Sequence, residues 1–362
     1  MRFAFDDDQL AFRDAVRDLL AKECPPEVVR AAWPDGTDAH GARKGEGARA
    51  ADDQVAKVWS ALADMGVLGI AVPEPQGGVG LAEVDWVLLA EETGYAGLPH
   101  PFVETACVAA PLFATVGDPD GLLPSLLDGS RQAGVLPLGT TLVPWGDRIT
   151  ALVLVQYDDQ AHRWWARRVD GGLARGDQPD APRALAPVLD AGRRVVQLEA
   201  WKAGPELGAA ADAAAAFDRG ALGTAAQLVG LGRRMLDLTV AYVAERKQFG
   251  VPVGSQQAVK HHLADAALQL QFAAPALYRA AASMAAGSSD AHRDVSMAKA
   301  LASDAARLVA RQALQCHGAI GYTVEYDLHL YLKRAEALAR SWGDASWHRG
   351  RVAWALQLTD PA

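Results

Sequence analysis

The spacing of apolar residues changes twice along this chain, and the change limits the folds that it can adopt. Across residues 7 to about 127, apolar side chains recur at the spacing of an amphipathic helix. From residue 134 to about 207 they gather in short β-branched and aliphatic runs, which clusters of Asp, Gly and Pro separate. Helical spacing then returns over long spans from residue 205 to 356. The order predicts a small β module between two helical ones.

We therefore predict an α+β fold that is mainly α. The predicted domains are an N-terminal helical domain (1–130), a small middle β-barrel or sandwich (131–207) and a C-terminal four-helix bundle (208–362). The clearest predicted strands are 151–156, 164–169 and 194–198. Residues 33–51, rich in Gly, Asp and Arg, interrupt the first domain and are predicted to form a mobile loop.

Composition narrows the classes of partner. Half of the 362 residues are apolar, which is enough for a large shared core. The 35 basic and 44 acidic side chains give a net charge of −9, which argues against nucleic acid or an anionic membrane as the main partner. The N-terminal residues lack the apolar core of a signal peptide, and no run of about 18 uncharged apolar residues follows, so we expect a cytoplasmic protein.

Neither the cysteines nor the paired histidines predict a metal site. Cys24, Cys107 and Cys316 have no metal-ligand spacing and cannot all pair, which favours a reduced compartment. His261 and His262 have no carboxylate or cysteine at ligand spacing.

A first candidate site lies at a predicted helix end. Arg246 and Phe249 precede a stretch with two Gly and one Pro that breaks the helical pattern, and Gln257 follows where the next helix begins. The planar fork of an arginine suits a pyrophosphate, an adjacent aromatic ring can face a heterocycle, and a glutamine adds a neutral donor. The alternative is a solvated surface charge.

A second candidate site contains Gln315, His317, Gly318 and Gly321. Two glycines three residues apart weaken a helix but allow a ligand to approach the backbone closely. We expect His317 to lie against such a ligand as part of the turn. The alternative is a tight crossing of two helices.

Together these segments resemble the acyl-CoA dehydrogenase family. In that family an Arg-x-x-Phe-Gly segment, a downstream Gln and a Gln-x-x-Gly-Gly-x-Gly turn reach across a subunit interface to the FAD of the neighbouring chain. The matching residues here are Arg246, Phe249, Gln257, Gln315 and Gly318, with Ala319 in place of the second Gly. Residues 69–80 and 91–94 resemble the signature of the family's first domain, so the likeness covers most of the chain and implies the same three-domain fold.

The sequence departs from the family where the chemistry is performed. Members remove an α-proton of an acyl-CoA thioester with a Glu while a hydride passes to the flavin, and that position falls on Trp342. Some members carry the Glu on the first helix of the last domain, which corresponds to Gly220 here. The next position, commonly an Arg for CoA, is Ala221, and residues 134–141 lack the Thr-Glu pair that normally cradles the flavin ring. The resemblance thus predicts no catalytic residue in this chain.

Residues that serve a neighbour's FAD are present, and residues that would serve this chain's own flavin are missing. This partition resembles the non-catalytic subunit of actinobacterial α2β2 acyl-CoA dehydrogenases, several of which act on CoA thioesters of steroid side chains. It implies a homologous catalytic partner that binds most of the acyl-CoA, an FAD shared across the interface, and electron-transfer flavoprotein as acceptor.

Three alternatives remain open from the sequence. A homomeric dehydrogenase could use a relocated base, with Asp344 and Asp218 the nearest candidates; their other readings are a helix-end charge and an N-cap, respectively. The chain could instead bind flavin or acyl-CoA without turnover. Finally, the fold also hosts flavin monooxygenases, which need no α-proton base.

Overall fold

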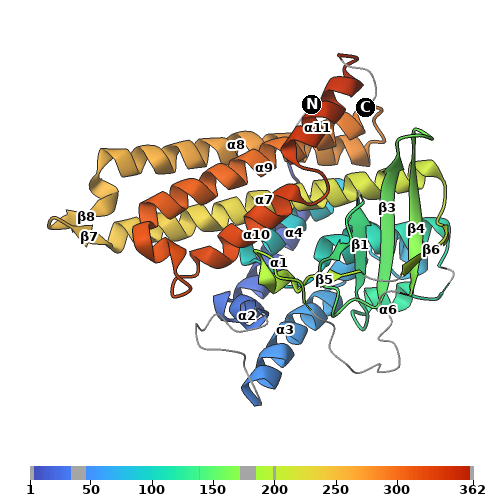
Figure 1. Cartoon of the computed structure of the whole chain (residues 1–362), viewed down its shortest axis with the longest axis horizontal. Helices are drawn as coiled ribbons and strands as arrows, with labels where there is room; N and C mark the ends of the chain where they lie inside the picture. Colours follow the sequence, from blue (N-terminus) through green and yellow to red (C-terminus); the bar gives the residue numbers. More distant parts are fainter. Residues whose placement is uncertain are drawn as a thin grey trace.

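The computed structural model describes residues 4–33, 46–118, 120–137, 139–171, 185–198 and 201–358. Its α-helices are α1 (Asp7–Glu23), α2 (Pro26–Ala31), α3 (Glu46–Asp64), α4 (Glu83–Ala96), α5 (Ala110–Val116), α6 (Leu123–Leu127), α7 (Ala210–Glu245), α8 (Gln257–Ala285), α9 (Ala291–His317), α10 (Leu328–Arg340) and α11 (Ala345–Ala355). Its strands are β1 (Ala133–Pro137), β2 (Leu142–Val143), β3 (Ala151–Asp158), β4 (Arg163–Gly171), β5 (Val196–Gln197), β6 (Trp201–Glu206), β7 (Lys247–Gln248) and β8 (Val251–Pro252). Figure 1 shows that helices dominate and that the main sheet is small, which confirms the predicted mainly α, α+β class.

The loop predicted at residues 33–51 is wrong over its last part. Helix α3 begins at Glu46, and the Ala-rich run at 48–51 has the composition of a strong helix former, which outweighs the single Gly47. Residues 34–45 lie outside the described part of the chain.

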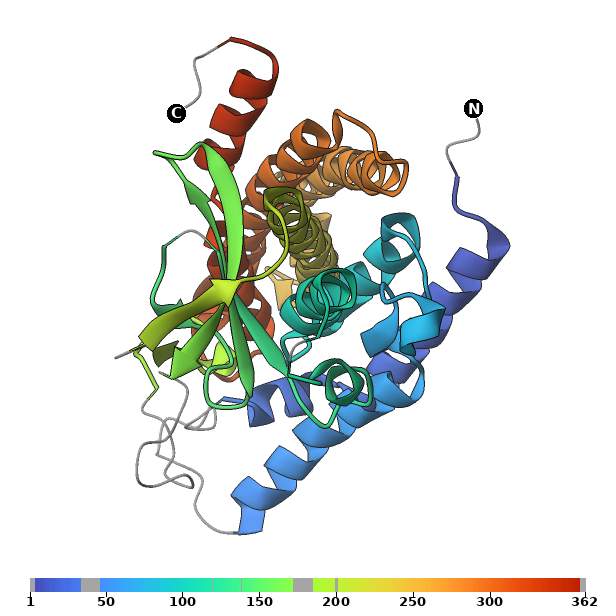
Figure 2. The ribbon, with the colours of Figure 1, turned by 90° about the vertical axis from the view of Figure 1, so that its right-hand side faces the viewer.

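The β1 to β6 region forms a mixed sheet of four strands beside a two-stranded one. In the order β1-β3-β4-β6, β1 pairs with β3 in parallel and the other two pairs are antiparallel, while β2 pairs with β5. Three of these strands overlap the predicted runs 151–156, 164–169 and 194–198. Figure 2 shows α7 between this sheet and α4. The Trp164 ring on β4 packs against the Phe217 ring on α7, with the ring centroids 4.3 Å apart.

Helices α7, α8 and α9 run side by side and form the long axis of the molecule, with α10 packed against α7 and α9 (Figure 1). Helix α7 also crosses α4 at very short range. A β-carbon on Gly94 would lie 2.2 Å from the Gln227 carbonyl oxygen, and one on Gly230 would lie 1.9 Å from that of Glu91. Only glycine fits at these two positions, so the crossing of α4 and α7 is set by the sequence.

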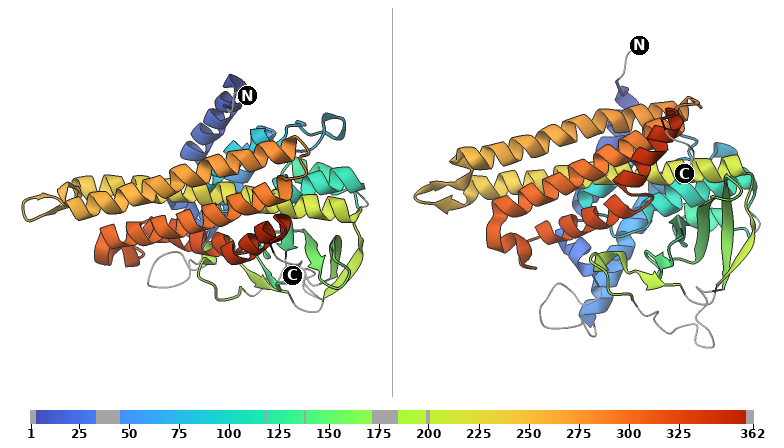
Figure 3. Two further views of the ribbon diagram at one scale, coloured as in Figure 1. Left: turned by 90° about the horizontal axis from the view of Figure 1, so that it is seen from above. Right: turned by 45° about the horizontal axis from the view of Figure 1, so that its top comes forward.

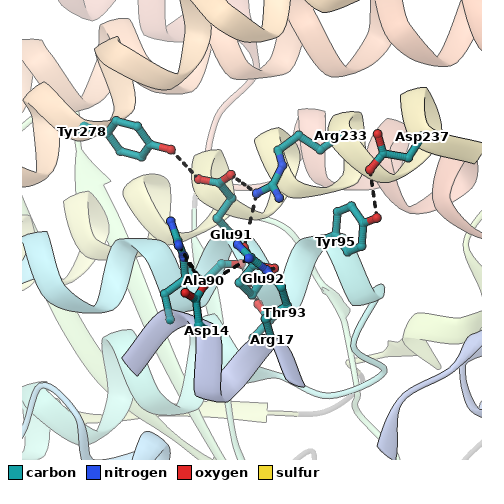
Figure 4. Close-up of polar contacts among 11 residues, drawn as sticks. Asp14, Arg17, Ala90, Glu91, Glu92, Thr93, Tyr95, Arg233, Asp237 and Tyr278 are labelled. Atoms are coloured by element: carbon teal, nitrogen blue, oxygen red, sulfur yellow. Dashed lines mark hydrogen bonds and ion pairs between the residues drawn. The ribbon is translucent and has the colours of Figure 1, made fainter. Parts of the chain in front are cut away.

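Two buried carboxylates on α4 join four helices (Figure 4). Glu91 accepts hydrogen bonds from the Tyr278 hydroxyl of α8, at 2.9 Å, and from Arg233 of α7. Glu92 accepts from Arg17 of α1 at 2.9 Å and from Arg233 at 3.3 Å. Breaking such a buried pair from one side is costly because the other charge stays buried, so this cluster fixes α1, α7 and α8 around α4.

None of the helices within the described ranges is both long and apolar enough to cross a membrane.

Candidate functional site

The first candidate cluster lies on a hairpin that projects beyond the helix bundle (Figure 3). Helix α7 ends where the backbone N–H of Arg246 donates to Tyr242, and β7 and β8 then pair in antiparallel register. Phe249 and Gly250 form the two-residue turn, with φ of 51° and 83°, as a type I′ hairpin requires. Phe249 is 99% exposed, so the turn presents an aromatic ring that none of the described residues covers.

The polar residues of this hairpin are also available. The Arg246 side chain is exposed and makes no ion pair with any described residue. Gln257 is the first residue of α8 and is exposed, and this helix start has no side-chain cap, so its N–H groups are open to an anion. The predicted helix end at Arg246 and the predicted helix start near Gln257 are confirmed, whereas Phe249 lies on the hairpin turn and not at the helix end.

The second candidate cluster meets the first at the same end of the bundle. Gln315 is exposed near the end of α9, and Gly318 ends this helix with φ 65° and ψ −141°, a backbone geometry that favours glycine. A β-carbon on Gly318 would meet nothing within 4 Å, so this part of the backbone is open. The Tyr242 hydroxyl donates to the His317 carbonyl oxygen at 3.4 Å, which links this turn to the α7 end.

His317, unlike Gln315 and Gly318, is buried. Its ring is buried and stacks on Tyr242, with centroids 4.3 Å apart, and also contacts Tyr326. Nδ1 bonds the Ala313 carbonyl oxygen at 2.8 Å, whereas Nε2 is buried and has no hydrogen-bond partner among the described residues. Burial lowers the pKa of His317, which favours the neutral ring. Within this chain the ring therefore supports the turn that carries Gly318.

The two positions that the sequence assigned to the family's base, Gly220 and Trp342, face one another at the N-terminal half of α7. A β-carbon on Gly220 would lie 2.3–2.4 Å from three carbons of the Trp342 indole. Trp342 is only 2% exposed and has a φ of 58°, and Phe217 packs against its ring at 5.9 Å. The indole thus occupies the space next to Gly220, and neither residue can accept a proton at neutral pH.

Two buried basic residues, Lys299 and His348, hydrogen-bond the backbone of the turn that carries Trp342. Lys299 Nζ donates to the carbonyl oxygens of Ala339, at 3.2 Å, and Gly343, at 3.0 Å. His348 Nε2 bonds the Trp342 carbonyl oxygen at 2.8 Å. Burial lowers the pKa of Lys299 to about 7 and that of His348 to about 3. These contacts fix the left-handed turn that points the indole toward Gly220.

Both of the relocated bases considered from the sequence make structural contacts. Asp218 lies inside α7 and is not an N-cap; it is buried and paired with Arg351, at 2.6 Å, and His292. Although burial opposes its ionisation, these two partners hold its pKa below the usual range. Asp344 is the N-cap of α11, where its Oδ1 accepts the Trp347 N–H at 2.8 Å. Both carboxylates have structural partners.

A cavity of about 420 Å³ opens between β1, the segment 188–195 and the turn after α10. Its walls include Trp342 and the buried Glu104, which lies in a π-helical turn (Val103–Ala109). Burial raises the pKa of the Glu104 carboxyl, although the nearby Arg193 opposes the shift. Sequence reasoning missed this acid. The available signal was one Glu inside the apolar run 101–110.

Gly220 and Arg246 lie far apart along α7. Arg246 follows Gly220 by 246 − 220 = 26 residues, which at the helical rise is about 39 Å. The structure therefore brings the Arg246 and Gln315 clusters together and keeps both away from Gly220, Trp342 and the cavity.

Comparisons with known proteins agree with this architecture. The chain matches the family model for the acyl-CoA dehydrogenase N-terminal domain over residues 6–122 and that for the C-terminal domain over residues 209–357. It is 31% identical over 335 residues to the acyl-CoA dehydrogenase IpdE2 of Mycobacterium tuberculosis, covering 92% of each chain.

Two solved structures share the fold over almost the whole chain. A chain of the ChsE4-ChsE5 complex from Mycobacterium tuberculosis superimposes with a TM-score of 0.79 and 22% identity, covering 100% of each chain. A chain of the Tcur3481-Tcur3483 steroid ACAD gives a TM-score of 0.77 with 23% identity, covering 97% of this chain and 98% of that one. With both family models matched in order and a relative aligned along nearly its full length, this chain belongs to the acyl-CoA dehydrogenase family.

Proposed function

We propose that this chain is the non-catalytic subunit of a heteromeric acyl-CoA dehydrogenase, and that it completes the FAD site of a homologous catalytic partner. The observation that carries the proposal is the position of the hairpin. Arg246, Phe249 and Gln257 are exposed at the far end of α7 from Trp342, and none of them lines this chain's own cavity. A cofactor that uses them would be held mainly by another subunit.

The residues present fit part of an FAD site. The Arg246 fork suits the pyrophosphate, and the open N–H groups at the start of α8 add to its attraction for an anion. The Phe249 ring offers an aromatic face, and Gln257 and Gln315 offer neutral donors. Gly318 allows close approach of the backbone, with His317 positioning it from within. FAD, when bound, supplies the hydride acceptor.

The remaining chemistry is assigned to the partner. Dehydrogenation of an acyl-CoA thioester needs a base within hydrogen-bond reach of the α-carbon. Here Trp342 and Gly220 offer none, and Asp218 and Asp344 are engaged in ion pairing and helix capping. This chain then shapes the assembly and retains the flavin, while the partner's Glu removes the proton.

The comparisons guide the choice of partner and substrate. ChsE4-ChsE5 is described as a complex and Tcur3481-Tcur3483 as a steroid ACAD, so we propose an α2β2 assembly that acts on a CoA thioester of a steroid side chain. Electron-transfer flavoprotein is the proposed acceptor and the cytoplasm the proposed compartment.

The test is to express the chain alone and together with a catalytic homologue, and to measure FAD content. Alone, we expect a colourless protein; together, about one FAD per two chains, because half of the sites lack their own platform. Arg246→Ala should lower the FAD retained by the complex several-fold, since a charge-assisted contact to the pyrophosphate is lost. Arg349→Ala, which removes an exposed arginine from α11, is the matched control.

The rival assignment is a homomeric enzyme with a relocated base. A yellow protein with one FAD per chain, expressed alone, would overturn our proposal. Asp344→Asn keeps a capping side chain and should leave the turnover of the complex unchanged. A large loss of turnover in this variant would favour the rival.

A further inference from the structure

The cavity beside Trp342 has the construction of a ligand site. Its volume of about 420 Å³ lies within the usual range for small-molecule pockets. One part of its wall is apolar and comes from both sheets and from the segment before the Ala191–Arg193 turn, including Val135, Leu136 and Val188. The rest is polar and comes from the π-helical turn, the Ala191–Arg193 turn and the end of α10.

The polar wall contains side-chain atoms whose hydrogen bonding is incomplete. Arg193 is buried and donates from Nη1 to Ser341 Oγ at 3.2 Å, while its Nε has no partner among the described residues. Asp190 is buried and paired with Arg334 through Oδ2, while its Oδ1 has none within the described ranges. Both unpaired atoms are buried rather than open to the cavity, but the residues that carry them line it, so the polar wall holds uncompensated polar groups next to the space where a ligand would bind.

The charges around the cavity do not balance. Arg193 and Arg340 line it and Arg334 supports it from behind, against the two acids Glu104 and Asp190. Arg340 is exposed at the end of α10 and makes no ion pair with any described residue. At least one cation is left over, because Lys333 also lies close enough to Asp190 to interact with its charge, and burial, which raises the pKa of Glu104, can only increase this excess. An added anion would offset part of the excess.

We propose that this cavity binds a small monocarboxylate with an apolar body. The carboxylate is taken by the lining arginines Arg193 and Arg340, and the body packs against Val135, Leu136 and Val188. A neutral molecule would leave the charge excess uncompensated, and the apolar part of the wall favours a ligand with one charged group and an apolar body over a polyanion. The site is separate from the hairpin and goes beyond the proposed function, because it would operate with or without a partner.

The test uses the full chain, in whichever assembly it purifies, with cyclohexanecarboxylate and its neutral isostere cyclohexanecarboxamide as probes. Calorimetric titration should show saturable binding of the carboxylate, with the amide at least about tenfold weaker because the charge-assisted contacts are lost. Equal binding of both probes would show that the cavity does not recognise a carboxylate, and this would overturn the proposal. If neither probe binds, the proposal is also overturned.

Variants locate the binding. Arg340→Gln should weaken binding of the carboxylate about fivefold or more and change binding of the amide little. Val188→Trp should abolish binding of both probes by filling the cavity. Arg349→Gln, outside the lining, is the control and should change neither. Arg340 is exposed and Val188 half-buried, so both variants should fold.

Riboflavin provides the competing outcome. If riboflavin binds the full chain and Val188→Trp blocks it, the cavity is a working flavin platform and the carboxylate assignment falls. Failure of the proposed function would instead appear in the FAD content of the Arg246→Ala complex, so the two failures are distinguishable.

Discussion

At the scale of single residues, Trp342 and Gly220 are in direct contact in the space where we propose that other family members hold their catalytic carboxylate. The indole lies where any side chain on Gly220 would have to go. Gly220→Ala should therefore cost about 1–3 kcal/mol through overpacking, and Trp342→Ala about 3–5 kcal/mol through the cavity it leaves. The measurement is urea denaturation of each variant.

The double variant Gly220→Ala/Trp342→Ala tests whether these two residues share the same space. With the indole removed, the added methyl of Gly220→Ala has room, so its cost should nearly vanish and the two changes should be strongly non-additive. Additive costs would mean that the two residues do not share this space.

A second residue-scale prediction concerns Lys299, which is 0% exposed and has only neutral hydrogen-bond acceptors: Ser303, Ala339 and Gly343. Its pKa falls from 10.5 in an unfolded chain to about 7 in the fold because of burial, despite the favourable charge of Asp344. Between these values the unfolded state binds the additional proton, so this group makes stability rise with pH. Its contribution should increase by about 2 kcal/mol from pH 7 to pH 9.

Lys299→Met should remove that rise. Other groups titrate in the same range, so the quantity to measure is the difference in unfolding free energy between wild type and variant at each pH. Lys260→Met, an exposed lysine on α8, is the control and should give a constant difference. A constant difference for Lys299→Met as well would show that the ammonium is not desolvated.

At the scale of elements, the crossing of α4 and α7 depends on the glycine contacts described above. Gly230→Ala places a methyl 1.9 Å from the Glu91 carbonyl oxygen, where backbone and not a flexible side chain must move. We expect a loss of about 3 kcal/mol or more. Gly350→Ala on α11 meets nothing within 4 Å and should be neutral or stabilise by about 0.5–1 kcal/mol. Thermal unfolding of both variants compares a helical glycine that is required with one that is not.

The β7–β8 hairpin trades stability for function in our assignment. Phe249 holds φ at 51° with its ring in solvent, a conformation that costs a non-glycine residue about 1–3 kcal/mol. Asn tolerates it better, so Phe249→Asn should stabilise the isolated chain slightly while lowering FAD retention in the complex. A variant that is more stable and retains FAD fully would exclude the ring from the cofactor site.

The sequence predicted the features that depend on neighbouring residues and missed those that depend on residues far apart in the chain. Gly and Pro lie between the end of α7 and the start of α8, so the local sequence was enough to predict this break between helices. The three-part order of elements was predicted from the periodicity of apolar residues. Asp218 was misplaced because its partner Arg351 lies 133 residues away. Glu104 was missed for a related reason. The cavity that makes it notable is built from segments separated by more than 200 residues, which no local pattern reveals.

At the scale of the whole molecule, the same α7 helix carries a closed end and an open end. The closed end packs against the sheet and the Trp342 turn, and the open end carries the exposed hairpin. Beyond the hairpin, α8 and α9 lie side by side with exposed apolar side chains one turn apart on each: Leu268 and Phe272, and Met297 and Leu301. A chain that works alone has little reason to expose so much apolar surface, so we expect the catalytic partner to cover it.

In the proposed complex, this coverage would make the stability of the chain depend on the partner. Binding that favours the folded state should raise Tm with partner concentration, by the equivalent of about 2.7 kcal/mol when free partner is at 100 times Kd. Phe272→Ser should reduce that rise and leave the Tm of the isolated chain unchanged, because the side chain is already 65% exposed. Leu358→Ser, exposed to a similar degree near the C-terminal end, is the control and should behave as wild type. If the Phe272→Ser complex gains as much as wild type, the α8–α9 face lies outside the interface, and the hairpin alone must hold the partner.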